Sequence, residues 1–209
     1  SRDHLLEALD REPGVYVPSR FRRTREGDGT SWRVVPRGDR TRPVTKCLVP
    51  DLEHAPYPEH PVIPFARVVH DRISIEAARG CPHGCRFCQA SVLYRPYRER
   101  SPERIRDLAV ANLKNTGHGD LSLLSLSIGD YRGLLPLTGM LMEKLQPCRV
   151  ALSLPSIRVG SLEPSVVEEI LRVRKTGFTL APEAGTKRLR TVINKESEEE
   201  ELVSSPECM

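Results

Sequence analysis

Three cysteines lie within eight residues of one another, at Cys81, Cys85 and Cys88 in the segment GCPHGCRFC. Glycines on both sides of Cys81 allow the backbone to wrap closely, so the three thiolates can converge on one iron-sulfur cluster. A fully ligated 4Fe-4S cluster takes four cysteines, so three ligands leave one iron open to another molecule. The spacing therefore predicts a cluster with an open coordination position.

The remaining cysteines are far from this window and from one another, which is unlike a disulfide framework. The alternative metal is zinc, with His83 as its fourth ligand. His83 lies inside the first cysteine interval, where tetrahedral ligation would be cramped, and zinc cysteines usually come as two separated pairs. We therefore favour the cluster, and keep a zinc-binding module without catalysis as the alternative from a different class.

The elements that must position this loop follow from an alternation of apolar runs and helical segments after residue 65. This alternation is typical of an α/β fold in which crossover helices join parallel strands. We expect strands at 73–78, 121–127, 149–154 and 177–181, and helices at 102–116, 132–146, 163–175 and from Thr186 onward. Ser101 and Pro102 suit the start of the first of these helices. The fold class we predict is α/β, a partial (β/α) barrel with about four units.

A polar motif follows each predicted strand: GCPHGCRFC, SIGDY, SLPSIRVG and APEAGT. In parallel α/β folds the loops at the carboxyl ends of the strands build the functional site. The four motifs should therefore lie together.

The sequence resembles the radical S-adenosylmethionine (radical SAM) superfamily, because CPHGCRFC matches its C-x3-C-x-aromatic-C signature, with Phe87 as the aromatic residue. Further segments, among them LSLLSLSIGDY, ALSLPSIRV and GFTLAPEAGTKRLRTVINK, resemble a little-characterised family of radical SAM proteins. In that family a cobalamin-binding-type domain usually precedes the core.

The resemblance implies an enzyme in which the 4Fe-4S cluster, held by the three cysteines, binds S-adenosylmethionine and generates a 5'-deoxyadenosyl radical from it. It also implies a low-potential electron donor of the flavodoxin or ferredoxin type, and cobalamin only through an upstream domain. The substrate is not indicated. Alternatives are a tRNA-modifying radical SAM enzyme and an inactive truncated fragment.

The remaining motifs supply the candidate contacts to S-adenosylmethionine. Ser127, Gly129 and Asp130 lie where the superfamily has a glycine-containing segment that meets the methionine amino group, although Asp130 could instead cap the next helix. Glu183 lies in a motif similar to one whose glutamate approaches the ribose, but it could instead complement a helix dipole. The other candidates are Phe87 near the adenine, and Ser153 and Ser156, whose hydroxyls could also stabilise a turn.

The cluster Arg95, Arg98, Arg100 and Arg104 could pair with a carboxylate or phosphate, or form a solvated helix entry, and Arg158 is an additional candidate.

We expect residues 1–64 to be a Pro-rich linker or the end of an upstream domain, with a helix end at about 1–12 and a short hairpin around 32–35. Residues 65–195 should form the N-terminal part of the radical SAM core, and 196–209 an acidic, disordered tail. The Ser at position 1 and this tail lead us to expect truncation at both ends. If so, the chain should hold a cluster weakly and turn over little.

The charge and the apolar pattern limit the partners. The net charge is +4, spread along the chain, and aromatic residues make up only 5% of it, so no aromatic and basic patch for single-stranded nucleic acid is evident. The sequence thus neither indicates nor rules out a nucleic acid as a binding partner.

No apolar run approaches the roughly 18 residues that span a bilayer, and the start lacks a signal-peptide pattern. We expect a cytoplasmic protein without a membrane partner.

Overall fold

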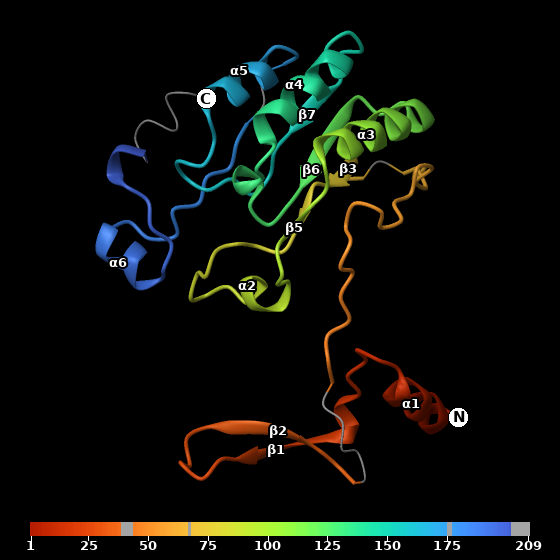
Figure 1. Ribbon diagram of the computed structural model, residues 1–209, viewed down its shortest axis with the longest axis vertical. Helices are drawn as coiled ribbons and strands as arrows, with labels where there is room; N and C mark the ends of the chain where they lie inside the picture. The colour runs from red at the N-terminus through yellow and green to blue at the C-terminus, as the bar shows by residue number, and fades with distance from the viewer. Residues whose placement is uncertain (39–43, 67, 175–176, 202–209) are drawn as a thin grey trace. The chain divides into compact units, whose positions relative to one another are not determined.

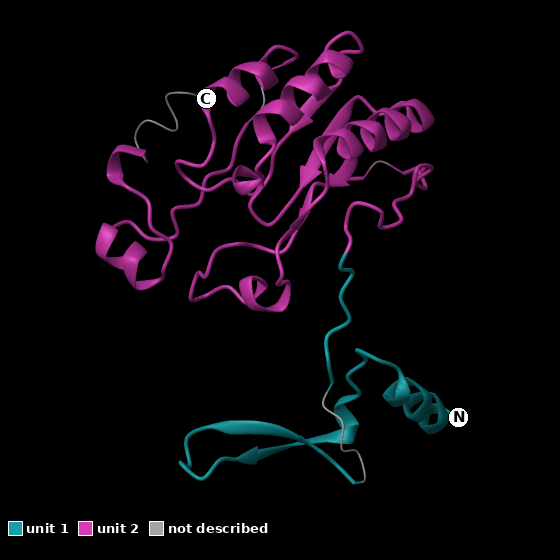
Figure 2. Ribbon diagram, viewed as in Figure 1, with its two compact units in different colours: residues 1–50 teal, residues 51–209 magenta. Residues whose placement is uncertain are grey.

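The computed structural model describes residues 1–38, 44–66, 68–174 and 177–201. The chain divides into two compact units, residues 1–50 and residues 51–209 (Figure 2). The predicted linker of 1–64 therefore ends in the second unit, which already includes the segment from Asp51. No helix of the described ranges is both long and apolar enough to cross a bilayer.

The first unit contains helix α1 (Arg2–Arg11), a 3-10 turn η1 (Pro18–Arg20) and a hairpin of β1 (Phe21–Arg25) and β2 (Trp32–Pro36). The two strands are antiparallel, with Arg25 opposite Trp32. Asp28 shapes the connecting turn, because its Oδ1 accepts hydrogen bonds of 2.9 Å from the amides of Thr30 and Ser31. The expected hairpin is thus present, and a carboxylate in its turn fixes it.

The second unit is built on a parallel sheet with the order β3-β6-β7, formed by β3 (Ile73–Glu76), β6 (Asp120–Leu124) and β7 (Ala151–Ser153). A short antiparallel pair, β4 (Ala78–Arg79) and β5 (Arg98–Glu99), continues from β3. The predicted parallel α/β architecture is confirmed for these strands. The fourth expected strand, 177–181, is reduced to one parallel bridge between Leu180 and Ile157. Strand formation depends on a partner strand, and among the described residues this run is paired only at that bridge.

Three longer helices alternate with the strands: α3 (Pro102–Thr116) precedes β6, α4 (Leu134–Leu145) joins β6 to β7, and α5 (Pro164–Leu171) follows β7. They lie side by side along the sheet (Figure 1), and the core between them and the strands is apolar and fully buried, with Ile75, Leu123, Ile105, Leu137 and Val166 among its members. The ends of α3 agree with the prediction, since the Ser101 side chain accepts from the Arg104 amide and Gly117 ends the helix with a φ of 72°. Residue 175, the predicted end of α5, lies outside the described residues.

The second unit also has three shorter elements: α2 (Ala90–Leu93), the 3-10 turn η2 (Ile128–Asp130) and α6 (Lys187–Val192). The predicted strand 121–127 ends early at Leu124 because Ser125 turns the chain, its Oγ accepting a 3.2 Å hydrogen bond from the Ser127 amide. The motif SIGDY therefore forms a turn at the carboxyl end of β6, the place where the sequence predicted a functional loop.

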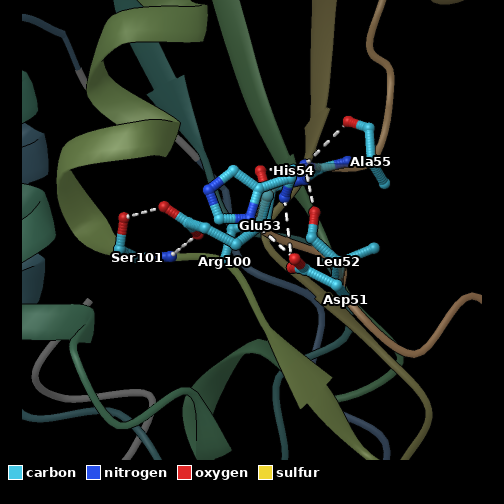
Figure 3. Close-up of polar contacts among 7 residues, drawn as sticks. All are labelled: Asp51, Leu52, Glu53, His54, Ala55, Arg100 and Ser101. Atoms are coloured by element: carbon cyan, nitrogen blue, oxygen red, sulfur yellow. Dashed lines mark hydrogen bonds and ion pairs between the residues drawn. The ribbon is translucent and has the colours of Figure 1, made fainter.

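Residues 51–55 are fastened to the start of α3 by two side chains (Figure 3). The buried Arg100 guanidinium donates to the carbonyl oxygens of Leu52, Glu53 and Ala55. In return, the Glu53 carboxylate accepts from the Ser101 amide at 2.7 Å and from the Ser101 hydroxyl at 2.6 Å. These contacts explain why this proline-bordered segment belongs to the second unit.

Candidate functional site

The cysteine loop begins directly after β4, and Gly80 is what allows its path. Gly80 has a φ of 97°, and a Cβ added there would lie 2.6 Å from the carbonyl oxygen of Tyr94. Only glycine tolerates both conditions. Beyond it, Cys81, Cys85 and Cys88 are all half-buried, and the Cys88 amide donates a 3.0 Å hydrogen bond to the Cys85 carbonyl, which closes a turn between the last two.

Burial and nearby negative charge act on the Cys81 thiol. Burial raises the pKa of Cys81, and the nearby Cys85, Asp130 and Cys88 raise that pKa further because each would bring a second negative charge close to the thiolate. Among the described residues, no three Cys, His, Asp or Glu side chains are placed to hold a single metal ion. In a cluster each thiolate binds a different iron, and positive iron would offset the repulsion between the thiolates.

Asp130 connects the SIGDY turn to the cysteine loop. Its Oδ2 lies 2.6 Å from His83 Nε2 and accepts a 2.5 Å hydrogen bond from the Ser127 hydroxyl. Asp130 does not cap the helix that follows, since α4 begins after Gly133 without a side-chain cap. The capping alternative is therefore wrong, and the carboxylate points instead to the cysteine loop.

Gly129 is required by close packing at the same turn. A Cβ added there would lie 2.1 Å from the Ser161 Oγ and 2.9 Å from the Ser161 carbonyl oxygen. Because backbone atoms contribute to this contact, a side chain at position 129 would displace the loop after β7. The turn after β6 and the loop after β7 are thus in direct contact.

The two serines of the third motif differ in position. Ser153 is the last residue of β7 and is half-buried. Ser156 is exposed, has the left-handed φ of 62°, and its carbonyl accepts a 3.3 Å hydrogen bond from the Ile128 amide. A non-glycine residue in this conformation is uncommon and is held there by its surroundings, as is frequent at functional sites.

Glu183 also has a left-handed backbone, with a φ of 68°. Its Oε1 accepts a 2.9 Å hydrogen bond from Lys195 Nζ. Glu183 precedes α6, but the helix is capped by the Thr186 hydroxyl and carries no acidic residue in its first turn. Glu183 is therefore paired with Lys195 rather than placed in the first turn of α6.

The chain just after α6 returns to the cysteine loop. Asn194 Nδ2 donates a 2.8 Å hydrogen bond to the Gly84 carbonyl, and the Arg86 amide donates a 2.9 Å bond to the Ile193 carbonyl. These bonds join residues more than 100 positions apart. The segment that follows the fourth motif and α6 is thus brought to the cysteine loop.

Arg158 contacts the cysteine loop at a sulfur atom. Its Nη1 donates to Cys85 Sγ at 3.6 Å, and its Nη2 donates to the Glu196 carbonyl at 3.3 Å. A guanidinium beside a sulfur stabilises negative charge on it. Residues of the predicted acidic tail therefore take part in the site as far as Glu196, whereas 202–209 lie outside the described residues.

The other predicted contacts have mixed outcomes. Phe87 is 55% exposed, so it is not a core residue and remains open to a ligand. The prediction that Arg100 binds a ligand is wrong, because the side chain is buried and its guanidinium donates hydrogen bonds to backbone carbonyls. Arg95 and Arg98 each donate to a nearby carbonyl, of Ser91 and Pro96 respectively.

Four residues of this site were not predicted as contacts: His83 toward Asp130, and Arg86, Asn194 and Lys195 around the end of α6. The sequence offered one usable signal, since Asn194 and Lys195 end the segment GFTLAPEAGTKRLRTVINK that carries part of the resemblance. Their partners lie far away in the sequence and could not be identified from spacing.

The sequence pattern of the Radical SAM superfamily matches residues 75–205, which is more than half of the chain. The chain belongs to the radical SAM superfamily. The match begins inside β3 and includes the cysteine loop and each of the motifs described above.

This radical SAM protein is also similar to "Uncharacterized protein MJ0966" from Methanocaldococcus jannaschii, with 33% identity over 132 residues. The matched part is 63% of this chain and 28% of the relative. The chain thus spans less than a third of the length of the curated relative it matches.

Proposed function

We propose that this radical SAM protein binds a 4Fe-4S cluster through Cys81, Cys85 and Cys88, and binds S-adenosylmethionine at the iron that the cysteines leave open. The observation that carries the proposal is the convergence on the cysteine loop of the turn after β6, through Asp130, and of the end of α6, through Asn194. When bound, the cluster supplies the electron that cleaves S-adenosylmethionine to a 5'-deoxyadenosyl radical. The substrate that this radical attacks stays open.

The chain's own residues suit the polar ends of S-adenosylmethionine. Within the described residues both hydrogen bonds to the Asp130 carboxylate end on Oδ2, so Oδ1 is left for an incoming ammonium group. Glu183 uses Oε1 for Lys195, which leaves its other oxygen for a ribose hydroxyl. The exposed Phe87 offers a ring face on which an adenine can pack.

We further propose that β3, β6 and β7 are the first strands of a (β/α) barrel. Their parallel order and their crossover helices support this, and so does the position of all four motifs at carboxyl ends of strands or of the Leu180 bridge. In a barrel these ends surround a common cavity, which would exclude water from the radical.

Anaerobic reconstitution with iron and sulfide tests the proposal. The chain should take up about four irons and four sulfides and gain a broad visible absorption that bleaches on reduction. Replacing all three cysteines by alanine should abolish the uptake, whereas Cys148→Ala, an exposed cysteine away from the loop, should leave it unchanged. Stoichiometric zinc without sulfide in the wild-type chain would overturn the proposal in favour of a zinc module.

A further inference from the structure

The hairpin of the first unit carries an exposed surface that the proposed function does not use. Because side chains alternate along a strand, Arg23 and Arg25 of β1 share one face with Trp32 and Val34 of β2. All four are exposed, and Trp32 is 57% exposed although it is the largest apolar side chain in the unit. We call these four residues the arginine–tryptophan face.

The two arginines are arranged around the indole ring. The guanidinium carbon of Arg25 lies 5.2 Å from the centroid of a Trp32 ring, and that of Arg23 lies 5.6 Å from it. Arg25 is directly opposite Trp32 in the ladder and Arg23 is opposite Val34. The antiparallel register therefore assembles a row of three planar groups, held together by cation–π attraction.

The charge of this hairpin is strongly one-sided. Between residues 18 and 37 there are six arginines and two acidic residues, Glu26 and Asp28. Asp28 is engaged by the turn, where the Ser31 amide and hydroxyl lower its pKa, and Glu26 lies 4.0 Å from Arg33. The net charge of +4 in this segment equals the formal net charge of the whole chain. The hairpin thus presents a concentrated positive field.

Planar cations beside an aromatic ring suit a partner that is both anionic and planar. Single-stranded polynucleotides meet both conditions, because phosphates pair with guanidinium groups and unstacked bases lie on aromatic or guanidinium planes. A membrane surface would need a wider apolar area than Trp32 and Val34 provide. An acidic peptide would use the charge but leave the indole without a matching group.

We propose that the arginine–tryptophan face binds single-stranded nucleic acid, with a base stacked on Trp32 and the backbone phosphates held by the surrounding arginines. The sequence pattern did not indicate this surface, because Trp32 is separated from Arg23 and Arg25 by the hairpin turn and aromatic residues are rare in the chain. Only the register brings the three side chains together.

The test uses the indole itself as its reporter, because Trp32 is the sole tryptophan of the chain. The full chain is titrated with an RNA dodecamer and with a DNA dodecamer of the same unstructured sequence. Saturable quenching of tryptophan fluorescence, with affinity that falls as salt rises, is expected for at least one of them. A difference between the two sugars identifies which nucleic acid the face prefers.

Variants separate charge from stacking, with binding measured by the fluorescence anisotropy of the labelled oligonucleotide. The double variant Arg23→Gln/Arg25→Gln should weaken binding at least tenfold and reduce the salt slope by about 1.4, since two charges are lost. Arg23→Lys/Arg25→Lys keeps the charge but removes the planar groups, and should give an intermediate loss. Trp32→Ala should weaken binding without changing the salt slope.

The matched control is Arg106→Gln/Arg172→Gln, which removes the charge of a partly exposed arginine in α3 and that of an exposed arginine directly after α5. This variant should bind like the wild type. The proposal is overturned if the control and the hairpin variant lose affinity equally, if heparin quenches Trp32 as strongly as the oligonucleotides do, or if only anionic vesicles bind. None of these outcomes depends on the cluster, so a failure of this proposal would not count against the proposed function.

Discussion

At the scale of single residues, the site depends on side chains that contact the cysteine loop from distant parts of the chain. Asp130 meets His83 across 47 positions, and Arg158 meets Cys85 across 73. The Arg158 contact carries a prediction, because hydrogen bonds and positive charge at cluster sulfurs raise the reduction potential of an iron-sulfur centre.

We predict that Arg158→Gln lowers the midpoint potential of the reconstituted cluster, since the guanidinium that stabilises the reduced, more negative state is lost. Arg158→Lys should give a smaller shift. The measurement is an anaerobic redox titration followed by visible absorption. The control is Arg132→Gln, whose side chain is 85% exposed and ion-pairs with Glu99. An unchanged midpoint in Arg158→Gln would show that the contact with Cys85 does not influence the cluster.

The sequence singles out Cys81, Cys85 and Cys88 because their spacing is a local pattern, and their role as cluster ligands stays a prediction. Asp130 and Glu183 could be singled out from their motifs, but their partners could not, because these contacts depend on how the loops fold back on one another. The alternatives for both residues invoked the nearest helix start, and in both cases the side chain has a distant partner instead. Patterns of neighbouring residues predict contacts between neighbours, whereas the contacts of this site join residues that are distant in the sequence.

At the scale of elements, the attachment of residues 51–55 to α3 is structural, although the sequence had suggested that Arg100, which makes this attachment, could bind an anion. Arg100 was one of four clustered arginines that suggested an anion site, yet it is buried and donates to the carbonyl groups of four residues, Leu52, Glu53, Ala55 and Glu76. Tyr131 adds a hydrogen bond of 2.8 Å from its hydroxyl to the Arg100 carbonyl. Arg100 therefore stabilises the fold.

We predict that Arg100→Met lowers the free energy of unfolding by about 1–3 kcal/mol, the usual cost of leaving buried polar groups without a partner. The measurement is urea unfolding followed by circular dichroism at helical wavelengths. Arg172→Met, which removes an exposed arginine directly after α5, is the control and should change stability little. Equal effects in the two variants would contradict the structural role of Arg100.

Helix and strand predictions differed in quality for a physical reason. Helix α3 carries its own start and stop signals in Ser101, Pro102 and Gly117, so its bounds agree with the prediction. The expected strand at 177–181 has no such local determinant, and strand formation depends on a partner across the sheet. There the structure has only the bridge from Leu180 to Ile157.

At the scale of the whole molecule, two compact units are joined by an irregular connection. Residues 45–50 are exposed and lie outside any helix or strand, whereas residues from Asp51 onward are fastened to the second unit through Glu53 and Arg100. Exposed segments outside helices and strands are the preferred sites of limited proteolysis.

We predict that the lysine-specific endoproteinase Lys-C cuts the native chain after Lys46 well before it cuts after Lys114 or Lys144. Lys114 and Lys144 lie within α3 and α4, where cleavage requires local unfolding. Mass spectrometry of a time course identifies the products. Early cleavage at Lys114 or Lys144 would contradict the division into a separate first unit and a packed second one.

The most direct test of the central claim is electron paramagnetic resonance of the reduced, reconstituted chain before and after addition of S-adenosylmethionine. If Cys81, Cys85 and Cys88 hold a 4Fe-4S cluster with one open iron, the spectrum of the reduced cluster should change when S-adenosylmethionine binds, and Asp130→Ala should require a higher concentration for the same change. A reduced cluster whose spectrum is identical with and without saturating S-adenosylmethionine would contradict the account.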